Sequence, residues 1–384
     1  MKETLQFPAA RRRIVCIDAL RGLVMVFMLA DHVRETFLLH LQVSDPMDVA
    51  TTPAALFASR LVAHLCAPVF VFLTGLSAFL YGARQEQGAA AAASFLAKRG
   101  LFLVVLELTV INFAWTGAFP PQVVYLQVIW AIGLSMLALA ALVRLPRAAL
   151  AAIGFAIVAG HNLLDPLHFA PGHPLHALWA VLHDRGWIEI GETLRVRTSY
   201  PVLPWIGIVC LGYASGPWFA GGFPAPDRQR RLLAWSAGAL GGFVLLRALD
   251  VYGDHSWAPG ATAGASVMAF FNVTKYPPSL LFTALTLGSG LLLLVVLERR
   301  HGRLADGLAV LGSAPMFFYV LHLYALQLLH LAAAAVAGDE AARFGAVWPV
   351  WALTLVLAVL LFPAVRAFAR LKARRRDIAW LKYL

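Results

Sequence analysis

The chain has 384 residues, of which 60% are hydrophobic and 13% charged, and its mean hydropathy is +0.74. A soluble domain cannot bury so much apolar material, and hydrophobic runs of about 20 residues recur from end to end, so the composition indicates a helical membrane protein. The net charge of +11 requires no nucleic-acid partner, because in a membrane protein the position of the basic residues decides their role.

We predict an all-α, polytopic bundle of about ten membrane-spanning helices, which forms one domain over residues 1–384. The first span is long enough to cross the bilayer and lacks a small-residue cleavage site, so we do not interpret it as a signal peptide. The spans are expected at residues 14–36, 61–81, 99–116, 122–143, 148–164, 201–220, 231–250, 278–298, 307–335 and 346–368.

Basic residues gather in the segments on the side of the N-terminus, which carry most of the 31 Lys and Arg residues. By the positive-inside rule, both termini are then cytoplasmic in a bacterial inner membrane. The basic tail, residues 366–384, is expected to lie at the anionic inner leaflet. The three cysteines have no C-x-x-C spacing, so neither a disulfide framework nor a metal site is indicated.

The first span carries a polar stripe. Arg21 and His32 are eleven residues apart, so they lie within about 20° of each other on one helix face and roughly 16 Å apart along the axis. His32 is a candidate general base. Asp31 points about 100° away and is expected to orient a partner elsewhere. Asp18, one turn before Arg21, forms either a simple ion pair with it or part of a phosphate-binding site.

Further candidates lie in later segments. His64 begins the second span, and His322 and Tyr324 lie inside the ninth. Each histidine is either functional or an ordinary hydrogen-bonded helix residue. Lys275 and Tyr276 stand where an outer segment enters the eighth span, and Lys275 either binds an anionic substrate or extends its ammonium group to the membrane surface.

Three predicted outer segments are longer than simple turns: residues 37–60, 165–200 and 251–277. They could form a lid over an outward-facing cavity, or they could be ordinary interfacial loops with aromatic anchors. The second segment is rich in histidine, with His168, His173, His176 and His183.

Residues 13–37 resemble the opening helix of the heparan-α-glucosaminide N-acetyltransferase-like family of bacterial membrane proteins, part of a wider superfamily of transmembrane acyltransferases. Similar blocks begin at His64, Tyr125, Lys275 and Met316, so the resemblance extends over residues 13–324. The type-3 acyltransferase family opens in a similar way, with an Asp-x-Leu-Arg run followed by a histidine at the end of the helix.

The resemblance implies acyl transfer from cytoplasmic acyl-CoA, in the first instance acetyl-CoA, to an amino sugar or other glycan outside. It implies that His32 is the base and that Asp18 and Arg21 are conformational or donor-binding residues. Our hypothesis adds Arg13 beside Arg21 at the donor site. In the lysosomal enzyme of the family the catalytic histidine lies further along, near Val43 of this chain, where His40 is the nearest histidine. His32 follows the type-3 pattern instead.

On this hypothesis Lys275, Tyr276 and His322 line the acceptor side or stabilise the developing oxyanion. The rival hypothesis is a transporter or lipid flippase that uses the same polar path without an acyl donor, and a third is an inactive family member that assists assembly. P-loop, G-x-S-x-G and H-E-x-x-H motifs are absent from the sequence, which disfavours the usual hydrolases and energised pumps. Membrane lipids are expected partners, and a homo-oligomer is compatible with the sequence.

Overall fold

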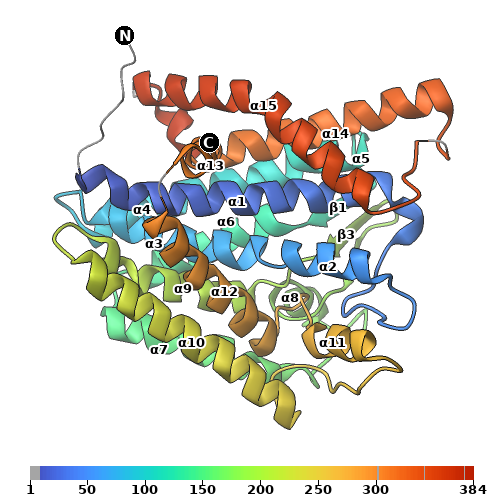
Figure 1. The fold of residues 1–384 in the computed structure, drawn as a ribbon, viewed down its shortest axis with the longest axis horizontal. Helices are drawn as coiled ribbons and strands as arrows, with labels where there is room; N and C mark the ends of the chain where they lie inside the picture. The colour runs from blue at the N-terminus through green and yellow to red at the C-terminus, as the bar shows by residue number, and fades with distance from the viewer. Residues whose placement is uncertain (1–8, 301, 341, 376) are drawn as a thin grey trace.

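Long helices dominate the computed structural model, which describes residues 9–300, 302–340, 342–375 and 377–384 (Figure 1). The helices are α1 (Ala9–Phe37), α2 (Ala54–Ala63), α3 (Cys66–Gly82), α4 (Ala89–Leu106), α5 (Asn112–Thr116), α6 (Val128–Leu142), α7 (Arg147–Gly160), α8 (His176–Leu182), α9 (Leu203–Ala214), α10 (Ala225–Leu249), α11 (Ala263–Phe271), α12 (Leu280–Arg299), α13 (Arg303–Gly312), α14 (Pro315–Ala337) and α15 (Trp348–Arg374). A π-helical turn, Glu107–Ile111, joins α4 to α5.

Within the described residues, seven helical stretches are long and apolar enough to cross a membrane. They are Ala54–Gly82, Ala89–Thr116, Arg147–Leu164, Ala225–Leu249, Leu280–Arg299, Pro315–Ala337 and Trp348–Arg374. Helices α6 and α9 are apolar but shorter, and α1 is 29 residues long but carries charged residues along its length. The helical membrane architecture agrees with the sequence analysis, whereas the number of ten spans stays a prediction.

Two predicted spans are divided differently. Residues 122–143 were expected to form one helix, but Val123–Leu126 is a strand and α6 begins only at Val128. The expected span 307–335 is broken between α13 and α14, where Pro315 occupies the first turn of α14. Proline suits the first turn of a helix but lacks the amide needed to continue the preceding one, which explains the break.

A small β-sheet makes the all-α prediction incomplete. Its strands are β1 (Val123–Leu126), β2 (Trp187–Ile190) and β3 (Leu194–Thr198). They are ordered β1-β3-β2, with β1 parallel and β2 antiparallel to β3. Gly191, with φ of 64°, supplies the left-handed residue of the turn between β2 and β3. Strands β2 and β3 lie in the predicted outer segment 165–200, and β2 contacts α8.

Helix α1 runs through the middle of the bundle (Figure 1) and packs extensively on α13. Glycines permit this close approach. A Cβ atom added at Gly22 would lie 1.9 Å from the carbonyl oxygen of Leu308, and one at Gly312 would lie 1.9 Å from that of Asp18. Because the obstructing atoms belong to the backbone, a side chain at either position would force the two helices apart.

We therefore expect Gly22→Ala to lower the free energy of unfolding by about 1–3 kcal/mol, the usual cost of overpacking. The measurement is the thermal unfolding midpoint of detergent-purified protein. Gly241→Ala is the matched control, since Gly241 lies in α10 with open space around its Cβ position, and alanine there should be neutral or slightly stabilising. Equal midpoints for the two variants would contradict this packing account.

Candidate active site

A cavity runs beside α1, and four residues of that helix line it: Arg21, Met28, Asp31 and His32. Arg21, Met28 and His32 recur at helical spacing, so they fall on one face of the helix, and Asp31 lies at the edge of that face. The cavity encloses about 1300 Å³ not filled by protein atoms, part of it open to solvent. The shared face predicted for Arg21 and His32 is thus the wall of one cavity. Its other lining residues include Thr74, Ser77, Arg99, Ile129, Met136, Tyr200, Lys275, Met316, Tyr319 and Lys372.

One end of the cavity is basic. Arg21 donates a hydrogen bond of 2.8 Å from Nη1 to Oδ1 of Asp18, and its Nη2 bonds the Ser77 hydroxyl. Arg99 and Lys372 lie within electrostatic range of Arg21 and line the same cavity. The Nε atom of Arg99 has no hydrogen-bond partner among the residues that the structure describes. Three cations facing one cavity, one of them paired with Asp18, form a site suited to a polyanion such as a phosphorylated ligand.

Farther along the cavity, His32 pairs with His322. Nδ1 of His32 lies 2.7 Å from Nε2 of His322, and the two rings are stacked with centroids 5.0 Å apart. Nδ1 of His322 lies 2.8 Å from the carbonyl oxygen of Phe318. A carbonyl only accepts, so Nδ1 of His322 carries the proton and its Nε2 accepts from Nδ1–H of His32. This arrangement leaves Nε2 of His32 with a free lone pair, as a general base requires.

Aromatic side chains surround the histidine pair. Tyr319 and Trp115 meet the His32 ring edge-on, with centroid distances of 5.8 and 5.3 Å. The Tyr319 hydroxyl and Trp115 Nε1 are both buried, and neither forms a hydrogen bond of normal geometry with a described group. Tyr319 lines the cavity and was missed in the sequence analysis. Its position three residues before His322 was the available signal, because such spacing puts both on one helix face.

Asp31 does not contact His32. Its carboxylate accepts from Nε of Arg34 at 2.9 Å and from Nη1 of Arg60 at 2.7 Å. Both arginine side chains are almost fully buried. The Asp31 carboxylate thus joins α1 to α2 through Arg60, and a part for Asp31 in catalysis stays a prediction.

Removing one member of a buried ion pair leaves an uncompensated charge. We expect Asp31→Ala to lower the free energy of unfolding by about 3–5 kcal/mol, because Arg60 loses its carboxylate partner. The double variant Asp31→Ala with Arg60→Met should recover part of this loss in a thermal unfolding experiment. A double variant less stable than Asp31→Ala alone would contradict the assignment.

The end of the cavity opposite Arg21 carries Lys275 and Tyr200. Lys275 is only 3% exposed, so it does not extend to the surface, and its Nζ lies over the rings of Tyr276 and Tyr200 at 5.1 and 5.8 Å. The Tyr276 hydroxyl donates to that of Tyr200 at 3.1 Å. Burial, reinforced by the Tyr276 hydroxyl, raises the pKa of Tyr200 well above its ordinary value, so this wall presents a phenol and an ammonium group.

Two of the predicted outer segments hold this wall in place. The backbone amides of Lys275 and Tyr276 donate to Oδ2 of Asp45 at 3.0 and 2.9 Å. Burial raises the pKa of Asp45, while the positive charges of Arg60 and Lys275 oppose that shift. The Asn272 side chain bonds both backbone groups of Met47. Two of the predicted outer segments therefore pack together at the Lys275 end of the cavity, as a lid would.

A family model for the catalytic region of heparan-alpha-glucosaminide N-acetyltransferase matches residues 13–256. The chain belongs to this family. The family implies an acyltransferase that acts in a membrane, which agrees with the apolar helices and with the resemblance noted in the sequence. The matched region contains Arg21, His32 and Arg99, whereas Lys275 and His322 follow it. No sequence among the curated proteins matches the chain.

Several predicted site residues lie elsewhere. His64 is 1% exposed, packs on Phe282 and does not line the cavity. Tyr324 donates from its hydroxyl to the carbonyl of Val110 in the π-helical turn, which is a structural contact. His40 is exposed and away from the cavity wall. The side chain of Arg13 lies outside the described residues.

Proposed function

We propose that this member of the family is a transmembrane acyltransferase. It moves an acyl group, acetyl in the simplest case, from cytoplasmic acyl-CoA at the Arg21 end of the cavity to an acceptor at the Lys275 end. The observation that carries the proposal is the single cavity lined by Arg21, His32 and Lys275. Along this cavity the basic site comes first, then the histidine with a free nitrogen, and then a separate polar wall.

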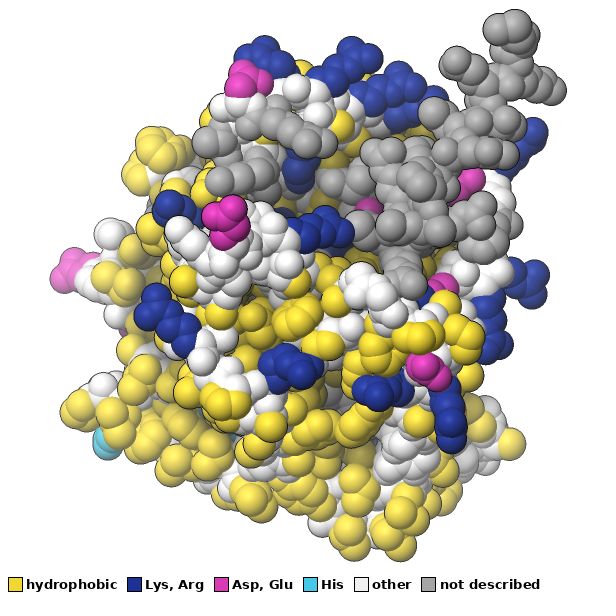
Figure 2. Space-filling model, turned by 90° about the vertical axis from the view of Figure 1, so that its left-hand side faces the viewer, with side chains coloured by type: hydrophobic (Ala, Val, Ile, Leu, Met, Phe, Trp, Pro, Cys, Tyr) yellow, Lys and Arg dark blue, Asp and Glu magenta, His cyan; other side chains and the backbone are white. Residues whose placement is uncertain are grey.

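The charge distribution supports the proposed direction. Helix α1 begins and α15 ends at the left-hand side of Figure 1, and Figure 2 shows that face with many Lys and Arg side chains and few acidic ones. An excess of basic residues marks the cytoplasmic side of bacterial inner-membrane proteins. Arg21 belongs to this end of α1 and His32 to the other, so the donor would enter from the cytoplasm.

The donor site fits coenzyme A through charge. Coenzyme A carries several phosphate charges, and Arg21, Arg99 and Lys372 offer three cations from three different helices. Guanidinium groups bind phosphate oxygens with charge-assisted, often bidentate hydrogen bonds. With the phosphates held there, the pantetheine arm would extend along the apolar middle of the cavity and place the thioester beside His32.

The reaction then follows from the histidine pair. The acceptor amine or hydroxyl attacks the thioester carbonyl while Nε2 of His32 takes its proton. The tetrahedral oxyanion forms near the Tyr319 hydroxyl, which lines the cavity and can donate a hydrogen bond to it. Collapse of the intermediate breaks the carbon–sulfur bond, and the departing thiolate takes the proton from Nε2. His322 keeps the proton on Nδ1 of His32 throughout and fixes the ring orientation.

The Lys275 end suits a sugar. Tyr200 offers the cavity an aromatic ring and a hydroxyl group of the kind that contact sugars, Tyr276 supports it from behind through a hydrogen bond, and Lys275 adds a buried cation. That cation disfavours a protonated amine and favours a hydroxyl or a neutral amine as the acceptor. The acceptor class we propose is therefore a glycan or amino sugar on the outer side of the inner membrane.

Membrane vesicles of defined orientation test the proposal. Acetyl-CoA with a labelled acetyl group, supplied to the cytoplasmic face of inverted vesicles, should label an acceptor inside them, while the same donor outside right-side-out vesicles should label nothing. Vesicles from a strain without the protein are the control. Labelling from the outer face, or equal labelling with and without the protein, would refute the proposal.

A further inference from the structure

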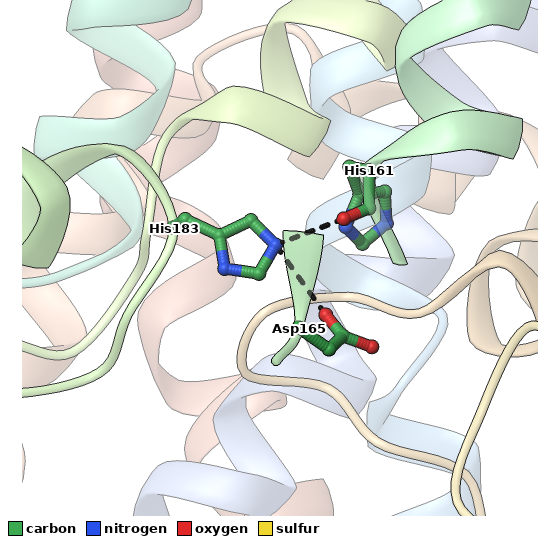
Figure 3. Close-up of side chains that lie close together, drawn as sticks. All are labelled: His161, Asp165 and His183. Atoms are coloured by element: carbon green, nitrogen blue, oxygen red, sulfur yellow. Dashed lines mark hydrogen bonds and ion pairs between the residues drawn. The ribbon is translucent and has the colours of Figure 1, made fainter. Parts of the chain in front are cut away.

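A second cluster of polar side chains lies away from the cavity. His161 and Asp165 follow the end of α7, and His183 follows the end of α8 (Figure 3). One potential ligand atom from each of the three lies within 4.8 Å of the others. None of the three lines the cavity described above. The cluster joins two segments that are about 20 residues apart in the chain, close to the start of α12.

The His161 ring is the member of the cluster whose polar atoms are least satisfied by hydrogen bonds. It is 2% exposed, and neither ring nitrogen forms a hydrogen bond of normal geometry with a described group. The carbonyl of Pro278 approaches the ring, which would suit one N–H donor and leave the second nitrogen with a free lone pair. A buried imidazole nitrogen without a partner is unfavourable unless something binds it.

A neighbouring side chain orients each of the other two members, Asp165 and His183. Asn162 donates to Oδ2 of Asp165 at 2.9 Å, which leaves Oδ1 facing Nε2 of His183 at 3.4 Å. On the far side of the His183 ring, Nδ1 lies 3.5 Å from Oδ1 of Asp184. A carboxylate behind the second nitrogen of a histidine is the usual support of a metal ligand, because it fixes the tautomer and the ring orientation.

The spacing also suits a metal. A histidine nitrogen and a carboxylate oxygen bound to one tetrahedral zinc ion, each at about 2.1 Å, lie roughly 3.4 Å apart. The distance between Nε2 of His183 and Oδ1 of Asp165 is 3.4 Å, which is long for a direct ion pair. Nε2 of His183 also lies 3.1 Å from the carbonyl oxygen of His161 (Figure 3), the arrangement that a metal-free cluster would keep.

We propose that His161, Asp165 and His183 bind one transition-metal ion, with Zn²⁺ the best fit and water as the fourth ligand. Two imidazoles and one carboxylate are a ligand set that favours zinc over magnesium or calcium. The Asp165 side chain is 48% exposed, so the fourth position faces solvent and an ion can enter. The cysteine spacing on which the prediction of no metal rested gives no information about this site.

The metal would act as a clasp on the outer wall of the cavity, a consequence that rests on the proposed function. His183 is followed by Asp184 and Arg185, and the Arg185 guanidinium lies over the Tyr276 ring at 4.7 Å. Tyr276 bonds Tyr200, which lines the cavity. Fixing His183 to the end of α7 would thus hold the acceptor end in shape without contact with the reacting atoms.

Metal analysis of the full-length protein tests the site. Protein purified without a histidine tag is stripped with a chelator, titrated with Zn²⁺ and dialysed. We expect one zinc per chain and a raised thermal midpoint, because an ion that binds only the folded state stabilises it. Co²⁺ in place of zinc should give the absorption of a tetrahedral site. Less than half an equivalent of zinc, or the same midpoint shift with Mg²⁺, would overturn the proposal.

Two variants make the test specific. Asp165→Asn retains the shape of a half-exposed side chain and should weaken zinc affinity by at least about 10- to 100-fold, the loss seen for disturbed metal sites. His173→Ala is the control, since His173 lies in the same outer segment, is exposed and stacks on Phe169. Zinc binding that survives Asp165→Asn but falls in His173→Ala would show that the loop histidines, and not the cluster, bind the metal. Because zinc binding needs no acyl donor, its outcome is independent of the transferase test.

Discussion

Replacement of His32 by alanine should abolish most of the acyl transfer while leaving donor binding intact. General-base catalysis contributes on the order of 10² to 10⁴ in rate, so we expect a fall of that size in kcat. The affinity for acetyl-CoA should change little, because the basic residues that would hold the phosphates lie at the other end of the cavity. The measurement is acetyl transfer by purified protein in vesicles, together with donor titration.

Two further variants sharpen this result. His40→Ala is the matched control, since His40 is exposed and stands near the place of the lysosomal enzyme's histidine, and it should retain full activity. His322→Gln should lose less than His32→Ala and should shift the pH profile of kcat, because in the proposed mechanism His322 only orients His32. An inactive His40→Ala protein with an active His32→Ala protein would contradict the assignment.

Replacement of Arg21 by alanine should weaken the binding of acetyl-CoA rather than slow the chemical step. A charge-assisted hydrogen bond to a phosphate is worth about 1.5–3 kcal/mol, so KM for acetyl-CoA should rise roughly 10- to 150-fold. The loss should be larger at low salt than at high salt, because ions screen the attraction between the cationic cluster and the donor. Arg21→Lys should recover part of the affinity through its charge alone.

The control for Arg21 is Arg84, another basic residue on the predicted cytoplasmic side. Arg84 is exposed and does not line the cavity, so Arg84→Ala should leave KM unchanged. A thermal unfolding measurement on both variants separates lost binding from lost folding, since Arg21 also pairs with Asp18. A fall in kcat with an unchanged KM in Arg21→Ala would contradict a donor-binding role.

Part of the site could be predicted because helix periodicity is local. The eleven-residue separation of Arg21 and His32 determines their shared face, and both line one cavity. The adjacency of Asp31 and His32 determines that they diverge, and Asp31 indeed pairs with Arg34 and Arg60. Such inferences need only the geometry of a single helix.

The remaining features of the site depend on contacts between segments that are far apart in the sequence. His32 and His322 are 290 residues apart, and no local pattern indicates which helices pack together. Arg99 and Lys372 looked like ordinary basic residues at membrane ends, and only helix packing brings them to the Arg21 end of the cavity. Strands β2 and β3 were missed because short strands in a polar outer segment carry little hydrophobic pattern.

The central claim is that one cavity binds an acyl-CoA at Arg21 and uses it at His32. Calorimetric titration of acetyl-CoA into detergent-purified wild type, Arg21→Ala and His32→Ala proteins tests that claim most directly. The account predicts saturable binding to wild type and to His32→Ala, and strongly weakened binding to Arg21→Ala. Absence of saturable binding to the wild type, or equal binding to all three proteins, would contradict it, and absence of binding would favour a transporter that needs no acyl donor.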